Sequence, residues 1–145
     1  MQDLPHHYKA SASADSDSSV MVSSEGLPSL ETAGPAEFGG PGDVWSPEEL
    51  LVASVSNCFI LTFRAIARAS KLDWNSVQCT SIGTLDKIEK VTQFTGFDVD
   101  VELTIPADTD AKKARRLIER AEHHCLITNS LKADTRLTAS VQAEV

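Results

Sequence analysis

The chain has 145 residues, of which 41% are hydrophobic and 23% charged, a composition typical of one globular domain. Its formal net charge is −8, which argues against nucleic acid and anionic lipid as partners, because both bind basic surfaces. We therefore expect a single domain spanning residues 1–145, whose function resides in particular sites.

The first fourteen residues are polar where a secretory signal would be apolar. We expect no membrane-spanning segment, because no run of about 18 consecutive apolar residues occurs. These features predict a cytoplasmic protein whose three cysteines are free thiols.

The N-terminal part predicts three short strands and a long loop. Weak alternation marks His6–Ala14, and β-branched or apolar residues mark Val20–Val22 and Leu27–Thr32. The loop Gly34–Trp45 holds four glycines and two prolines, which exclude a helix and a regular strand ladder. A loop of this length is often functional or packed against another element.

A long helix is predicted from Ser46 to about Ser70. Ser46 can cap it, Pro47 suits its first turn, and Glu49 can complete a capping box. Its body is apolar in every direction, which is typical of a helix buried in the fold or against a partner subunit. The residues that give this pattern are Leu51, Val52, Val55, Phe59, Ile60 and Leu61.

Two paired strands are predicted next, at Val77–Leu85 and Phe94–Ile105, because both segments alternate. In the second, Phe97, Val99, Val101, Leu103 and Ile105 share the core face.

A second helix, capped by Asp108 or Thr109, should then run to about His124 with Ala114, Leu117, Ile118 and Ala121 inside. A short helical turn after Cys125 and a last strand at Asp134–Val145 complete an α+β chain with the order βββ-α-ββ-α-β.

The cysteines lie in three different elements. Cys58 is in the middle of the long helix, where a thiol commonly packs as a small hydrophobe. Cys125 follows two histidines at the end of the second helix, where a helix terminus or a cationic imidazole can favour the thiolate. Cys79 alternates within a strand, which indicates a core position.

The run His123-His124-Cys125 invites a metal interpretation, but adjacent helical residues point about 100° apart and cannot share one ion. Paired ligand spacings of structural zinc sites are also absent from the sequence. We expect no metal and no other cofactor.

Three segments carry a resemblance to a known family. The stretch from Pro47 to Leu51 with the later Asn57-Cys58-Phe59 is similar to the N-P-E-E-L…C-F pattern of the OsmC/Ohr family. The loop 38–42 and the segment 125–131 also resemble that family. The resemblance implies the OsmC-like α+β fold, with a long central helix in an intertwined homodimer.

The resemblance further implies a thiol-dependent peroxidase that acts on organic hydroperoxides in response to oxidative stress. Cys58 would be oxidised to a sulfenic acid, Cys125 would condense with it to a disulfide, and an external dithiol would reduce that disulfide. The partners implied are a second subunit, a small organic hydroperoxide and the dithiol.

Glu48 matches a carboxylate that in the family anchors an activating arginine. It precedes Cys58 by ten residues, or about 15 Å along one helix, so it would serve the Cys58 of a second subunit. As an alternative, acids in the first turn simply favour the helix dipole.

The sequence departs from the family pattern at the arginine, because no arginine precedes Arg64 and only Lys9 is cationic in that stretch. Lysine lacks the bidentate geometry of a guanidinium. The alternative is therefore a non-catalytic OsmC-like protein that binds a small molecule or senses oxidation through the same two thiols.

Overall fold

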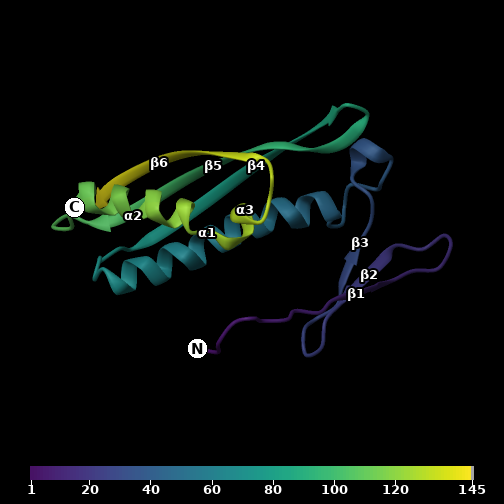
Figure 1. The fold of residues 1–145 in the computed structure, drawn as a ribbon, viewed down its shortest axis with the longest axis horizontal. Helices are drawn as coiled ribbons and strands as arrows, with labels where there is room; N and C mark the ends of the chain where they lie inside the picture. Colours follow the sequence, from purple (N-terminus) through teal and green to yellow (C-terminus); the bar gives the residue numbers. More distant parts are fainter. Residues whose placement is uncertain (145) are drawn as a thin grey trace. The chain divides into compact units, whose positions relative to one another are not determined.

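The structure is a computed structural model that describes residues 1–144 in the order β1-β2-β3-η1-α1-β4-β5-α2-α3-β6 (Figure 1). The chain divides into two compact units, Met1–Leu51 and the residues from Val52 onward. The expectation of one domain remains a prediction. The α+β class and the order of the main elements agree with the sequence predictions.

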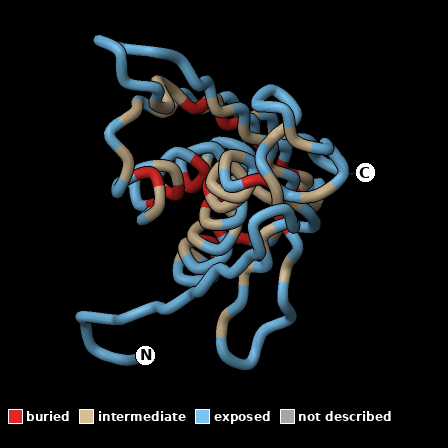
Figure 2. Tube along the Cα trace, turned by 90° about the vertical axis from the view of Figure 1, so that its right-hand side faces the viewer, coloured by how far each residue is buried: buried red, intermediate tan, exposed pale blue. Residues whose placement is uncertain are grey.

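The first unit contains a small antiparallel sheet of β1 (Ser11–Ser13), β2 (Val20–Ser23) and β3 (Leu30–Thr32). Strands β1 and β3 are shorter than their predicted ranges, whereas β2 begins at the predicted Val20 and extends one residue past Val22. Figure 2 shows the N-terminal tail as exposed, which agrees with residues 1–10 being solvent-accessible throughout.

The loop 34–45 contains a short 3₁₀ turn, η1 (Ala36–Phe38). The prediction that glycine and proline would exclude helix from this loop is therefore wrong for three residues. Pro35 precedes the turn and Gly39 ends it at a φ of 87°, a left-handed conformation that glycine adopts without steric cost.

Helix α1 (Pro47–Ala69) begins and ends within one residue of its predicted bounds. The Glu49 amide donates to Ser46 Oγ at 3.1 Å, and the Ser46 hydroxyl donates to Glu49 Oε1 at 2.9 Å. The serine is thus the N-terminal cap that the sequence predicts. The Ser46 hydroxyl, rather than the Ser46 backbone amide, is the group that donates to the Glu49 carboxylate.

The second unit consists of a sheet and the helices that pack on one face of it (Figure 1). Strand β4 (Ser76–Ile88) pairs antiparallel with β5 (Val91–Pro106), which pairs parallel with β6 (Asp134–Glu144). The predicted core row on the central strand β5 is confirmed, because all five of its apolar residues are buried: Phe97, Val99, Val101, Leu103 and Ile105.

Helix α2 (Ala111–His123) is followed by the one-turn helix α3 (Leu126–Asn129). The cap of α2 is Asp110, whose carboxylate accepts the amides of Lys112 and Lys113. The prediction of Asp108 or Thr109 as the cap is wrong, because the Thr109 amide closes a turn onto the carbonyl of Pro106. The four predicted interior residues of α2 are all buried.

Helix α1 passes closely over β4 within the second unit. A Cβ on Gly83 would lie 2.8 Å from Val52 Cγ2, so only glycine permits this approach. Farther along, Ser56 Oγ lies 2.6 Å from Ser81 Oγ. The sheet face that carries Ser81 therefore faces α1.

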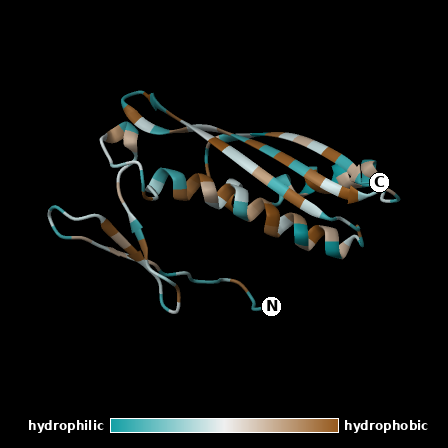
Figure 3. Cartoon of the chain, turned by 180° about the vertical axis from the view of Figure 1, so that it is seen from behind, coloured by the Kyte–Doolittle hydropathy of each residue, from teal (hydrophilic) through white to brown (hydrophobic). Residues whose placement is uncertain are grey.

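One stripe of α1 is buried, at Val55, Phe59, Phe63 and Ala67. The helix is nevertheless apolar over more than this stripe (Figure 3). The most apolar window of α1 has a mean hydropathy of 1.8, so by length and composition alone this helix could cross a membrane. Only 22% of that window is buried in the fold. The sequence-based exclusion of a spanning segment was therefore too strict on these two criteria.

Candidate functional site

The thiols of Cys58 and Cys125 are the centre of the candidate site. Cys58 is half-buried in the middle of α1, and Cys125 is 2% exposed at the N-terminal cap of α3. Hydrogen bonding with the Cys125 side chain is among the causes that lower the pKa of Cys58. The structure thus brings together two predicted site residues that are 67 positions apart in the sequence.

The environment of Cys58 favours its thiolate. Burial raises the pKa of this thiol, but hydrogen bonds from the Ile127 amide, the Cys125 thiol, Thr62 and the Leu126 amide outweigh burial and lower the pKa below its ordinary value. Thr62 Oγ1 lies 3.8 Å from Cys58 Sγ. The chain therefore stabilises a thiolate with amide and hydroxyl donors, without a neighbouring cation among these causes.

Cys125 is held as the protonated partner. Burial is the main cause that raises the pKa of its thiol, and the neighbouring Cys58 raises it further, although Thr128 opposes the shift. The Thr128 hydroxyl also donates to the carbonyl of Cys125 at 3.2 Å. One low-pKa thiol beside one high-pKa thiol is the arrangement of a nucleophile and a resolving group.

Glu48 lies in the first turn of α1, at the end of the other compact unit. Its Oε1 is buried and has no hydrogen-bond partner among residues 1–144. A buried carboxylate oxygen without a donor costs about 1–3 kcal/mol. The proposed role of Glu48 as an anchor remains a prediction. An acid that only favoured the helix dipole would not need a buried oxygen without a hydrogen-bond donor.

The two histidines that precede Cys125 are both exposed, and the Asn129 side chain donates to the carbonyl of His123. Within residues 1–144, no group of three or more His, Cys, Asp or Glu side chains could hold a metal ion.

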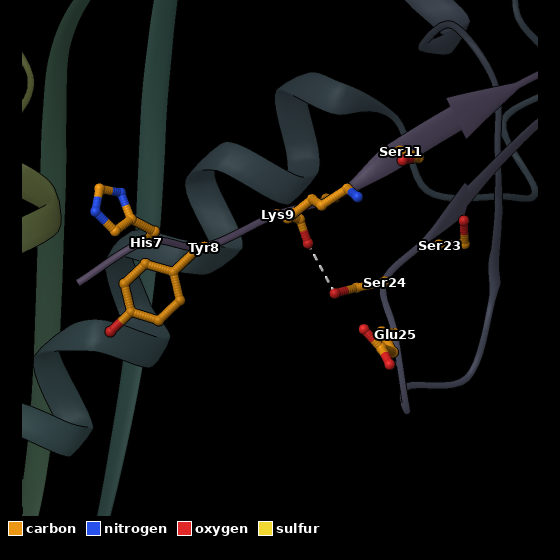
Figure 4. Close-up of a pocket in the computed structure, with 8 residues that line it drawn as sticks. His7, Tyr8, Lys9, Ser11, Ser23, Ser24 and Glu25 are labelled. Atoms are coloured by element: carbon orange, nitrogen blue, oxygen red, sulfur yellow. Dashed lines mark hydrogen bonds between the residues drawn. The ribbon is translucent and has the colours of Figure 1, made fainter.

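A separate groove of about 540 Å³ lies in the first unit (Figure 4). It is lined by His7, Tyr8 and Lys9 together with the Ser23–Glu25 segment, and the Ser24 hydroxyl donates to the carbonyl of Lys9. The groove contains no thiol. Lys9, the single cation before Arg64, thus lies on an open polar surface.

Cys79 is less buried than the sequence predicts. It was predicted as core, but it is half-buried on the α1-facing side of β4. Burial raises the pKa of its thiol, hydrogen bonds with Ser56 and Ser81 oppose that shift, and the charge of Cys125 adds to it.

Known proteins resemble the chain in both sequence and fold. The uncharacterized protein YmaD of Bacillus subtilis is 26% identical over 106 residues, which cover 71% of each chain. An OsmC-like protein of unknown function from Vibrio cholerae has a TM-score of 0.86 at 18% identity, covering 94% of this chain and all of its own.

An organic hydroperoxide resistance protein from Legionella pneumophila has a TM-score of 0.77 at 24% identity, covering 97% of this chain and all of its own. These similarities confirm the predicted OsmC-like fold. The family model of OsmC-like proteins matches residues 40–140, which is more than half of the sequence. The chain therefore belongs to the OsmC-like protein family.

Proposed function

We propose that this protein is a two-cysteine thiol peroxidase that reduces organic hydroperoxides. The observation that carries the proposal is that the thiols of Cys58 and Cys125 affect each other's pKa, which is lowered for Cys58 and raised for Cys125. Support comes from similar folds that belong to organic hydroperoxide resistance proteins, including those of Legionella pneumophila and Elizabethkingia anophelis.

The chemistry follows from the pair. The Cys58 thiolate attacks the distal oxygen of the hydroperoxide, the O–O bond breaks, and an alcohol leaves after taking up a proton. The resulting sulfenic acid is attacked by Cys125, which forms a disulfide and releases water. An external dithiol then returns both thiols through a mixed disulfide. The amides of Leu126 and Ile127 stabilise Cys58 as a thiolate before the attack.

Turnover of cumene hydroperoxide with dithiothreitol or a lipoyl dithiol, followed by stopped flow, tests the proposal. Cys58→Ser should reduce consumption to the rate without protein, whereas Thr138→Val, at an exposed position on β6, should retain it. Equal rates for wild type and Cys58→Ser would overturn the peroxidase.

The missing arginine favours a second candidate, a non-catalytic protein that senses oxidation by forming the Cys58–Cys125 disulfide. This candidate predicts the disulfide after one equivalent of oxidant, but no sustained turnover with a dithiol. Retention of three free thiols after oxidation would exclude both candidates, and peptide mapping would show this directly.

We also propose that the active form is a homodimer that covers the open face of α1. Leu61 is 54% exposed in the middle of an apolar helix, and burying such side chains against a second copy would stabilise the assembly. A second copy could also supply a donor to Glu48 Oε1, which has none among the described residues.

Leu61→Asp is expected to convert the dimer to a monomer, because it would place a charge in an apolar interface. Light scattering at one protein concentration measures the mass. The control is Ile82→Asp, at an apolar position on β4 that is also exposed, at 63%. A wild-type mass of one chain would contradict the dimer, as would an unchanged dimer in the Leu61→Asp variant.

A further inference from the structure

Helix α2 is a basic element in an acidic chain. It carries five of the 13 lysine and arginine residues but only two of the 21 acidic ones, so its formal charge is +3 in a chain of −8. Its apolar residues are buried, whereas four of its five cations are exposed. The positive charge is therefore displayed on the side of α2 that faces away from the core. The five cations are Lys112, Lys113, Arg115, Arg116 and Arg120.

These cations are concentrated at the end of the helix that disfavours them. The first six residues of α2 hold four of the five, and its first turn has no acid. The N-terminus of a helix carries a partial positive charge, so cations there are unfavourable and acids favourable. The Asp110 carboxylate caps the helix by accepting the amides of Lys112 and Lys113. The four cations beyond this cap are not what helix stability alone would select.

Two of the four have a contact within the fold. Lys113 Nζ donates to the carbonyl of Ser70 at 2.8 Å, directly after the end of α1. Arg115 Nη1 donates at 3.2 Å to the carbonyl of Ala139 on β6, which lies beside α2 (Figure 1). These two side chains therefore hold α2 against its neighbours, and their charges have a structural use.

The other cations form a row without such a use. Lys112, Arg116 and Arg120 recur every fourth residue, so they lie along one side of α2; we call them the α2 basic row. All three are exposed, and their side chains make no hydrogen bond or ion pair within residues 1–144. Glu119 is also exposed on this helix and forms no ion pair with them. Like charges at this spacing repel each other, so the row opposes helix formation unless a partner neutralises it.

The α2 basic row leads along the chain to the thiol pair. Helix α2 ends at His123, and Cys125 follows two residues later as the N-cap of α3. His123 and His124 are exposed, and Leu126 is 65% exposed. The surface between the row and α3 is thus open to a binding partner.

We propose that the α2 basic row is the docking surface of a protein reductant that carries acidic residues around its dithiol. This inference rests on the proposed peroxidase function, which needs an external dithiol. Charge complementarity favours an acidic occupant. A membrane or a nucleic acid presents negative charge over a wide area and would also meet the acidic remainder of a chain of charge −8. A protein can confine its acids to the area that faces the row.

Docking brings the dithiol of the reductant to the oxidised pair. One thiolate of the reductant attacks the Cys58–Cys125 disulfide, the bond between the two cysteines breaks, and a mixed disulfide forms. The second thiol of the reductant then displaces the cysteine of this chain. Two electrons and two protons pass from the dithiol to the pair, so both cysteines end as thiols and the reductant leaves as a disulfide.

Two synthetic dithiol peptides test the docking surface. In one, a pair of cysteines is flanked on each side by three glutamates, and in the other by three glutamines. The full-length protein is oxidised with diamide, and its reduction by each peptide is followed by acid quench, alkylation and intact mass. The glutamate peptide should act at least about tenfold faster at low ionic strength. This advantage should vanish in about 1 M sodium chloride, which screens charges beyond about 3 Å.

The variant Lys112→Gln/Arg116→Gln should lose the advantage of the glutamate peptide and keep the rate of the glutamine peptide. The matched control, Lys87→Gln/Lys90→Gln, removes the same charge from exposed positions near the tip of the β4–β5 hairpin and should keep the advantage. The row variant should also unfold at the same or a higher temperature, because it removes cations from the N-terminal turns of α2. A lower unfolding temperature would mean that the row serves the fold, and would overturn the proposal.

Equal rates for the two peptides with wild type, or an advantage that persists in the row variant, would also overturn the docking surface. So would the absence of a Cys58–Cys125 disulfide after diamide. Binding of phosphatidylserine vesicles or of a DNA duplex that is lost in the row variant would assign the row to another class of partner. Because diamide forms the disulfide, these results are separate from peroxidase activity. Turnover of cumene hydroperoxide with dithiothreitol would leave the peroxidase standing if the docking surface failed.

Discussion

Cys58 is expected to be the first thiol that iodoacetamide alkylates, with a pH midpoint below that of an ordinary cysteine. The sign follows from the hydrogen bonds, because donors to the sulfur stabilise the thiolate and lower the pKa of Cys58. Burial raises the pKa of both Cys79 and Cys125. A thiol with a lower pKa has more thiolate at neutral pH, so we expect the tryptic peptide 10–64, which contains Cys58, to be labelled faster than the other two cysteine peptides.

Removing a donor should move that pH profile in a known direction. Cys125→Ala removes a side chain that is among the causes lowering the pKa of Cys58, so the midpoint of Cys58 alkylation should shift to higher pH. Thr62→Val should shift it the same way, because it removes the hydroxyl 3.8 Å from the sulfur. Thr138→Val is the control for a threonine away from the thiol. A midpoint unchanged in both Cys125→Ala and Thr62→Val would show that these donors do not activate Cys58.

The predictable parts of the fold are those in which local chemistry and burial agree. The cap of α1 was predictable because a serine followed by a proline and two glutamates is a typical sequence of a helix N-terminus, and the Glu49 amide does donate to Ser46 Oγ. The alternation in β5 placed its core row correctly because each inward residue is apolar and each outward one polar. The sequence did not predict the end of the β4–β5 hairpin, where β4 continues to Ile88 and β5 begins at Val91. Its two turn residues, Glu89 and Lys90, have φ of 48° and 71°, a conformation that the sequence signals only when glycine or asparagine is present.

The candidate site was less predictable than the fold. No spacing in the sequence relates Cys58 to Cys125, and their pairing was inferred only from the family resemblance. Residue patterns could not predict that the amides of Leu126 and Ile127 lower the pKa of Cys58. Every residue except proline has a backbone N–H, and only the path of the backbone determines where that N–H points. Glu48 was selected by the same resemblance. Its unpartnered oxygen is a property of packing that no motif encodes.

The position of Cys58 depends on how firmly α1 is packed within the second unit, and Phe63 contributes to that packing. Phe63 is completely buried, its ring is 6.4 Å from that of Phe59, and Trp74 meets it edge-on at 5.6 Å. Phe63→Ala should therefore lower the free energy of unfolding by about 3–5 kcal/mol, through lost burial and the cavity left behind. Urea unfolding at a fixed protein concentration measures this as a lower midpoint at constant slope.

Arg64→Ala is the matched control on the same helix, and because Arg64 is exposed its effect should stay within about 0.5 kcal/mol. A loss below about 1 kcal/mol for Phe63→Ala would mean that the site collapses around the cavity or that α1 is held mainly by other contacts. Phe63 follows Cys58 by five residues, so a loosened α1 should also weaken the hydrogen bonds that reach Cys58 from α3. The alkylation midpoint of Cys58 should then move to higher pH in Phe63→Ala but not in Arg64→Ala, which would link the packing of the helix to the reactivity of its thiol.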